Sequence, residues 1–271
     1  MRPGEGLELL LVFRPRGLRS AAVKAAVTLY GEALARGSTL VLLDLPKGFE
    51  LLLARGLTPS EALKEAVERR LLPSSPSALS ALEPVVEAAA KLSRELGIEL
   101  TCYSDSSELV EEHALASEVA RFTLRASITG VRDSDLDAWL GLIERRLELG
   151  SRSLGRTVDE LGFHAARARK PLCLTGLEAW ELARRLRKLG FKVELKSAGL
   201  PYLYAPLEVA SRLVSMNRLD RRLLRRLIEE HVGFVREFVV RSSSLDEAYE
   251  AWLKAKAPWL TSHSAPSPST Y

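Results

Sequence analysis

Short apolar runs that alternate with longer segments of helical periodicity are the strongest constraint on the fold of this 271-residue chain. The runs cover residues 7–13, 39–45, 99–103, 172–174 and 191–195. Strands that are apolar on both faces are typical of a parallel sheet buried between helices. The sequence therefore predicts an α/β fold with a mainly parallel sheet, helices on both of its faces and a C-terminal helical segment.

Helical patterns fill the intervals between the expected strands. They cover residues 18–36, 49–54, 58–72, 79–96, 107–128, 134–149, 158–169 and 175–190. Thr58-Pro59-Ser60-Glu61 and Thr175-Gly176-Leu177-Glu178 both have the spacing of a capping box. This spacing predicts a helix start at each place.

The pattern changes after Pro206, where strand-like runs stop. Residues 207–216, 219–240 and 245–260 have helical periodicity, and the first two helices are either continuous or broken near Asn217. The last residues are polar and rich in Pro and Ser. We expect an α/β core over residues 1–206, a helical appendage over 207–260 and a disordered tail over 261–271.

Residue usage suggests a hot source and a reducing compartment. Glutamine is absent, Asn217 is the sole asparagine, and 29 arginines accompany 10 lysines, which is typical of thermophilic proteins. Cys102 and Cys173 lie in apolar runs without a CxxC spacing, which favours buried thiols. With no apolar stretch of about 20 residues and no signal peptide at the first residues, we expect a cytoplasmic protein without a membrane partner.

The sequence lacks the motifs of several enzyme classes. It contains no GxxxxGK[ST], no GxGxxG after the first strand, no GxSxG and no HExxH or HxH. These absences argue against a P-loop nucleotidase, a dinucleotide enzyme, an α/β-hydrolase and a zinc protease. We therefore expect neither a cofactor nor a metal ion.

Polar residues follow the expected strands, and ligands of open parallel sheets bind at the carboxyl ends of strands. The ligand-binding candidates are Arg14, Arg16, Lys47, Tyr103, Thr175 and Glu178. The catalytic candidates are Asp44, Asp105 and His164. Such groups suit a small anionic or zwitterionic ligand. The plainer interpretation is that strand ends are polar in any case and that the lone histidine is structural.

The C-terminal segment suggests two further functions. Arg222, Arg225 and Arg226 lie opposite an apolar helix face and are candidates for contacts with nucleic-acid phosphates. The plainer interpretation is a solvated face partly paired with Glu229 and Glu230. Alternatively, a helix surface with Trp252 and Trp259 docks a protein partner or a second copy of the chain.

The order of elements over residues 7–195 resembles the TraB/PrgY-type fold, which is similar to the ChaN- and erythromycin-esterase-like proteins. The matching segments are LLLVFRPRGLRSAAVKAAV, TLVLLDLPKGFELLL, EAAAKLSRELGIELTCYSD and VDELGFHAARARKPLCLTGLEAW. Asp44 stands at the acidic position of the second segment. The family's two GxxH-type histidines are missing, because residues 13–16 and 176–179 contain no histidine.

The resemblance implies the fold and a pocket at the strand edge. Without the two histidines, it does not carry over the metal-dependent peptidase activity proposed for some relatives. We expect a protein that binds a small anionic ligand or a partner at the carboxyl edge of its sheet. We expect a binding protein rather than an enzyme, with a hydrolase-like activity left open.

Overall fold

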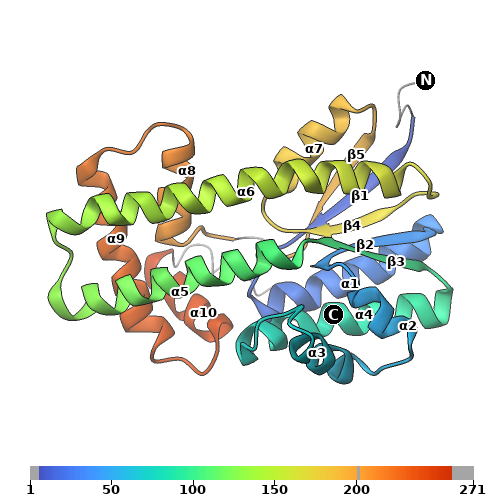
Figure 1. Ribbon diagram of the computed structural model, residues 1–271, viewed down its shortest axis with the longest axis horizontal. Coiled ribbons are helices and arrows are strands. Elements are labelled where there is room, and N and C mark those ends of the chain that lie inside the picture. The colour runs from blue at the N-terminus through green and yellow to red at the C-terminus, as the bar shows by residue number, and fades with distance from the viewer. Residues whose placement is uncertain (1–5, 200–201, 258–271) are drawn as a thin grey trace, which may run out of the picture. The chain divides into compact units, whose positions relative to one another are not determined.

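The computed structural model describes residues 6–199 and 202–257 (Figure 1). Within these residues the strands form one five-stranded sheet with the order β3-β2-β4-β1-β5, and all neighbouring strands are parallel. The strands are β1 (Glu8–Phe13), β2 (Leu40–Pro46), β3 (Glu99–Ser104), β4 (Leu172–Thr175) and β5 (Lys192–Ser197). The predicted parallel sheet is confirmed, and β4 lies between β1 and β2.

Helices cover both faces of the sheet, as the apolar character of its strands predicts. Leu10 and Val12 of β1 pack with α1 (Arg19–Arg36), α2 (Phe49–Ala54), α3 (Pro59–Glu68) and α4 (Pro76–Leu96). Leu9 and Leu11 pack on the other face with the end of α6 (Leu136–Ala165) and with α7 (Ala179–Lys188). Figure 1 shows α1 and α4 on one side of the strands and α7 on the other.

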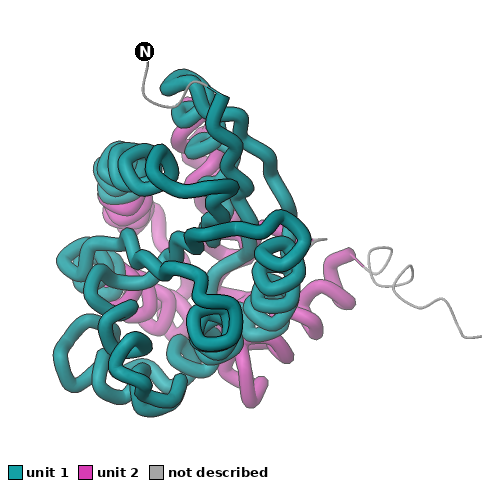
Figure 2. The backbone as a smooth tube through the Cα atoms, turned by 90° about the vertical axis from the view of Figure 1, so that its right-hand side faces the viewer, with its two compact units in different colours: residues 1–114, 148–200 teal, residues 115–147, 201–271 magenta. Residues whose placement is uncertain are grey.

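The described chain divides into two compact units (Figure 2). Unit 1 contains residues 6–114 and 148–199, with the whole sheet, and unit 2 contains residues 115–147 and 202–257. The sequence instead placed a boundary at residue 206. Residues 115–147 group with the C-terminal residues because their apolar side chains share one core with them. The expected tail over 261–271 and Trp259 lie outside the described residues.

Unit 2 is helical. It contains parts of α5 (Ser106–Thr129) and α6, a 3-10 turn at Asp133–Asp135, and then α8 (Pro206–Ser215), α9 (Arg221–Phe234) and α10 (Leu245–Lys256). A π-helical turn, Val235–Val239, extends α9. α8 and α9 are separate because Asn217 adopts a left-handed conformation, with φ of 53°. The core of unit 2 includes Leu136, Trp139, Ile143, Leu207, Ala210, Leu224, Ile228 and Val232.

The prediction of two helices over 134–149 and 158–169 was wrong, because α6 is continuous from Leu136 to Ala165. Gly150, Ser151, Ser153 and Gly155 in the middle of this segment are weak helix formers. Contacts with α5 within unit 1 hold it helical instead. The Arg152 guanidinium lies 2.9 Å from Glu111, Ser153 donates a hydrogen bond of 2.6 Å to Glu108, and Arg156 pairs with Glu108.

The two expected capping boxes have different outcomes. Thr58 and Glu61 cap α3 reciprocally, as predicted. The box over residues 175–178 was wrong: α7 begins at Ala179, and no side chain caps its first turn. Thr175 belongs to β4, and its hydroxyl lies 3.0 Å from a carboxylate oxygen of Glu178. The same residue types thus form a turn between a strand and a helix.

The two cysteines are free and buried, as predicted. Cys102 packs on the α1–α4 face of the sheet and Cys173 packs on the α6–α7 face. Burial raises the pKa of both thiols, so neither is an activated nucleophile. Among the described residues, we find no helix that combines the length and the apolarity needed to cross a bilayer.

His231 of α9 is a polar group inside the apolar core of unit 2. Its ring lies edge-on to Trp139, with the ring centroids 6.2 Å apart, and its Nδ1 atom is buried without a hydrogen-bond partner. Burial lowers the pKa of His231 to about 4, and the nearby Arg146 adds to the effect. The folded state therefore favours the neutral imidazole.

We predict that acid destabilises the protein through His231. The unfolded chain takes up this proton near pH 6.5, whereas the folded chain does so only near pH 4. The unfolded state binds more protons between these values, so the free energy of unfolding falls as the pH drops from 6.5 to 4. The loss is about 3 kcal/mol at most, because each pKa unit corresponds to about 1.4 kcal/mol.

Urea denaturation at neutral pH and near pH 4 measures this loss. His231→Phe removes the buried nitrogen, so the variant should lose less stability on acidification than the wild type. His113→Gln is the matched control, because His113 is exposed, and it should lose as much as the wild type. Equal losses in wild type and His231→Phe would contradict the assignment.

Candidate functional site

The candidate site lies where β1 and β4 end side by side. β1 continues into α1 on one face of the sheet, whereas β4 continues into α7 on the other. Neighbouring strands whose connections leave to opposite faces form a topological switch point, and open α/β sheets bind ligands there. The first backbone contact beyond the strands is from the Arg14 amide to the Thr175 carbonyl oxygen, at 3.1 Å.

A buried ion pair joins the ends of β1 and β2 across the end of β4. The Nη2 atom of Arg14 lies 3.3 Å from one carboxylate oxygen of Asp44 and 3.5 Å from the other. Only 2% of the Arg14 side chain and 1% of the Asp44 side chain are exposed. The Nε atom of Arg14 is buried and has no hydrogen-bond partner. One donor of a buried guanidinium is thus left unused, which is uncommon in folded proteins.

Arg16 connects Asp44 to Glu178. Its Nε atom lies 3.1 Å from Asp44 and its Nη2 atom lies 2.5 Å from Glu178. Desolvation opposes the charge, but the carboxylates of Glu178 and Asp44 outweigh it and raise the pKa of Arg16. The guanidinium therefore stays cationic, and 46% of the side chain faces solvent.

Three donors surround one carboxylate oxygen of Glu178. They are the Arg16 guanidinium at 2.5 Å, the Thr175 hydroxyl at 3.0 Å and the Gly176 amide at 3.1 Å. We call these three groups the anion cradle. Gly176 allows the close approach, since a Cβ atom there would lie 2.4 Å from Glu178 and 3.0 Å from Arg16. The cradle thus holds an anion that belongs to the chain itself.

Tyr103 lies near Arg16, Asp44 and Glu178, but its hydroxyl bonds to the sheet. Its hydroxyl donates a hydrogen bond of 2.8 Å to the Leu174 carbonyl oxygen of β4. Burial raises the pKa of Tyr103 well above its ordinary value. The phenol is therefore a neutral donor already in use, and the structure gives it no free proton for a ligand.

The remaining predicted site residues lie in other contacts of unit 1. Lys47 pairs with Glu160 of α6 at 2.5 Å, and His164 lies 3.6 Å from the same carboxylate. Asp105 accepts hydrogen bonds of 2.8 Å and 2.7 Å from the Ser107 amide and hydroxyl at the start of α5. These bonds lower the pKa of Asp105 and give it the role of a helix cap.

The basic stripe of α9 is partly neutralised within unit 2. Arg225 pairs with Asp133 at 2.6 Å. Arg222 and Arg226 are exposed, and neither has an ion pair among residues 6–199 and 202–257. Two free guanidiniums remain of the three that the sequence suggested for phosphate contacts.

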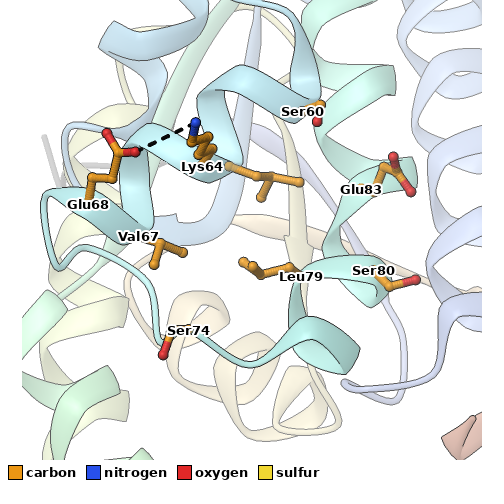
Figure 3. Close-up of a pocket in the computed structure, with 9 residues that line it drawn as sticks. Ser60, Lys64, Val67, Glu68, Ser74, Leu79, Ser80 and Glu83 are labelled. Carbon is orange, nitrogen blue, oxygen red and sulfur yellow. Dashed lines mark ion pairs between the residues drawn. The ribbon is translucent and has the colours of Figure 1, made fainter.

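The predicted site residues belong neither to a metal-ligand cluster nor to the groove between α3 and α4. No group of three or more His, Cys, Asp or Glu side chains within the described part of the chain is arranged to hold a metal ion. A groove of about 460 Å³ lies between α3 and α4, and Figure 3 shows Lys64 and Glu68 paired at its rim and Leu79 across from them. None of the predicted site residues lines this groove.

The ligand-binding candidates from the sequence did not include Gly176, nor Trp180, whose exposed ring lies against Phe13 at the end of β1. The Gly176 signal was available, because a glycine directly after a strand often marks a close backbone approach. The Trp180 signal was not, because an aromatic residue on an amphipathic helix is normally part of a core. Comparisons with known proteins add no assignment: no family model, curated protein or solved structure gives a significant match to the chain.

We predict that Asp44→Asn strongly destabilises the protein. The substitution leaves the Arg14 cation buried without a counter-ion, and breaking a buried pair in this way costs about 3–5 kcal/mol. The control is Glu160→Gln, which breaks the more exposed pair with Lys47 and should cost about 1 kcal/mol or less. Chemical denaturation measures both values, and similar losses would show that Asp44 is not a buried anchor.

We predict that Gly176→Ala displaces the Glu178 carboxylate from the cradle, because its Cβ atom would lie 2.4 Å from it. The cost should be about 1 kcal/mol or less, since the clashing atoms belong to flexible and partly exposed side chains. Adding Glu178→Ala should recover part of this loss, since the nearest clashing atom is removed. Gly155→Ala is the control: its Cβ atom meets open space in α6, so it should stabilise the protein by about 0.5–1 kcal/mol. Strictly additive effects of Gly176→Ala and Glu178→Ala on the free energy of unfolding would refute the cradle geometry.

Proposed function

We propose that the protein binds a small anionic ligand, a phosphate or a carboxylate, at the ends of β1 and β4. The observation that supports this most is the anion cradle, in which a guanidinium, a hydroxyl and a backbone amide hold the Glu178 carboxylate. These donors are the ones that proteins use for phosphates and carboxylates. In the proposed complex, the ligand anion takes the place of the Glu178 carboxylate.

Charge balance favours the exchange. Arg14, Arg16, Asp44 and Glu178 together carry no net charge, since two guanidiniums face two carboxylates. When Glu178 moves out, the remaining groups carry one positive charge, which an anionic ligand neutralises. Of the four side chains, Arg16 and Glu178 are accessible, with 46% and 34% of their surfaces exposed.

Each residue has a separate task in the complex. Arg16 binds the ligand through Nη2 while its Nε atom stays on Asp44. Thr175 and Gly176 donate their hydrogen bonds to the ligand oxygen instead of to Glu178. Asp44 holds both arginines in place. None of these tasks is a bond-breaking step, so we propose binding and no reaction.

The same residues support a relation to the TraB-like superfamily, which we propose as a histidine-free one. Arg14 and Arg16 lie in the segment that resembles the first histidine-bearing segment, and Gly176 and Glu178 lie in the segment that resembles the second. The two segments meet through the 2.5 Å contact between Arg16 and Glu178. In this chain an ion pair thus stands where the family pattern has histidines.

We predict that removing the charge of Glu178 improves anion binding. Inorganic phosphate, added to the full-length protein at constant ionic strength, should raise the midpoint of thermal unfolding. Glu178→Gln keeps the shape of the side chain and weakens the internal competitor, so phosphate should bind about tenfold more tightly. Arg16→Gln should abolish binding.

Arg152→Gln is the matched control. Arg152 is also a half-exposed arginine of unit 1 paired with a glutamate, but it lies on α6, outside the cradle. Its phosphate affinity should equal that of the wild type. The proposal fails if phosphate does not bind to Glu178→Gln, or if Arg16→Gln and Arg152→Gln bind it equally well.

A further inference from the structure

Trp180 is a large aromatic side chain that unit 1 leaves in solvent. It lies in the first turn of α7, and 64% of it is exposed. The other two tryptophans of the described chain, Trp139 and Trp252, are buried, with 1% and 4% exposed. Trp180 is thus not needed to fill a core, and its indole face is available for another contact.

One contact fixes Trp180 next to the anion cradle. Its ring lies against the ring of Phe13, with the centroids 6.1 Å apart and the planes at 60°. Phe13 is the last residue of β1, it pairs with Thr175 of β4 and it directly precedes Arg14. The exposed indole is therefore held at the same two strand ends that form the cradle.

Glu178 and Trp180 reach the end of β1 from the same short segment. Glu178 contacts Arg16, and Trp180, two residues later, contacts Phe13. A ligand that displaces the Glu178 carboxylate therefore has an aromatic surface beside it. A bare phosphate makes no use of that surface, whereas a ligand with a planar ring stacks on it.

We propose that the ligand of this site is a phosphate ester that carries a planar aromatic ring, such as a nucleoside monophosphate. Its phosphate occupies the anion cradle, and its ring stacks on Trp180. Indole faces accept any nucleobase, because every base has a π-face. This inference rests on the proposed function and adds the ligand class to it.

The test compares three probes on the full-length protein by calorimetry: adenosine 5′-monophosphate, ribose 5-phosphate and adenosine. Adenosine 5′-monophosphate should bind about tenfold more tightly than ribose 5-phosphate, from the gain expected of one stacked base. Adenosine should bind more weakly than either phosphate ester. Binding of the nucleotide should also quench tryptophan fluorescence.

Trp180→Ala separates stacking from phosphate binding. The variant should bind both phosphate esters with the affinity that the wild type has for ribose 5-phosphate. Because Trp180 is exposed, the fold and the thermal midpoint of Trp180→Ala should be those of the wild type. Trp180→Phe should recover part of the preference for adenosine 5′-monophosphate over ribose 5-phosphate.

The outcomes distinguish the two proposals. If both phosphate esters bind wild type and Trp180→Ala equally, the anion site stands and the aromatic ligand class is overturned. If neither ester binds but adenosine does, the cradle is unused and both proposals fail. If Trp180→Ala loses affinity for ribose 5-phosphate as well, Trp180 does not act by stacking, and the inference fails.

Discussion

One buried carboxylate holds the functional edge of this sheet together. Asp44 lies near the end of β2, whereas its partners, Arg14 and Arg16, follow β1, and the short strand β4 lies between β1 and β2. β4 ends at Thr175, whose carbonyl oxygen accepts a hydrogen bond of 3.1 Å from the Arg14 amide. Arg14 has no other carboxylate partner among the described residues, and an unpaired charge at such a depth is very unfavourable. The ion pairs therefore fix where β1, β2 and β4 end relative to one another.

Much of this edge could be predicted from sequence. Apolar runs located all five strands within one or two residues, and the rule that ligands bind at strand ends selected Arg14, Arg16, Asp44, Thr175 and Glu178. The rule does not say which strand ends are neighbours. Lys47 and Asp105 also follow strands, but they lie at the β2–β3 side of the sheet, where α6 and the start of α5 supply their partners.

The parts that sequence reasoning missed depend on contacts between distant residues. Helical periodicity predicted two helices where α6 is continuous, but Arg152 and Ser153 hold the segment between them to α5. Thr175 and Glu178 have the spacing of a helix cap. In the structure, however, Thr175 pairs with Phe13 as the last residue of β4, and Glu178 forms an ion pair with Arg16. Similarly, residues 115–147 have no unusual composition, and only the shared core assigns them to unit 2. At each of these places, contacts between residues distant in the sequence outweigh the local structural preference of the segment.

The network at the switch point has a fixed half and an exchangeable half. Arg14 and Asp44 are almost fully buried, so their interaction determines whether the edge folds. Glu178 and Arg16 face solvent, so their pair gains little from a low dielectric and opens at small cost. A carboxylate that the chain supplies itself keeps the cradle ordered while no ligand is bound, and it is also the first group that a ligand must displace. The affinity for an external anion is therefore set by the difference between its own interaction with the cradle and that of the Glu178 carboxylate. Changes at Glu178 act on this affinity, whereas changes at Asp44 act on the stability of the fold.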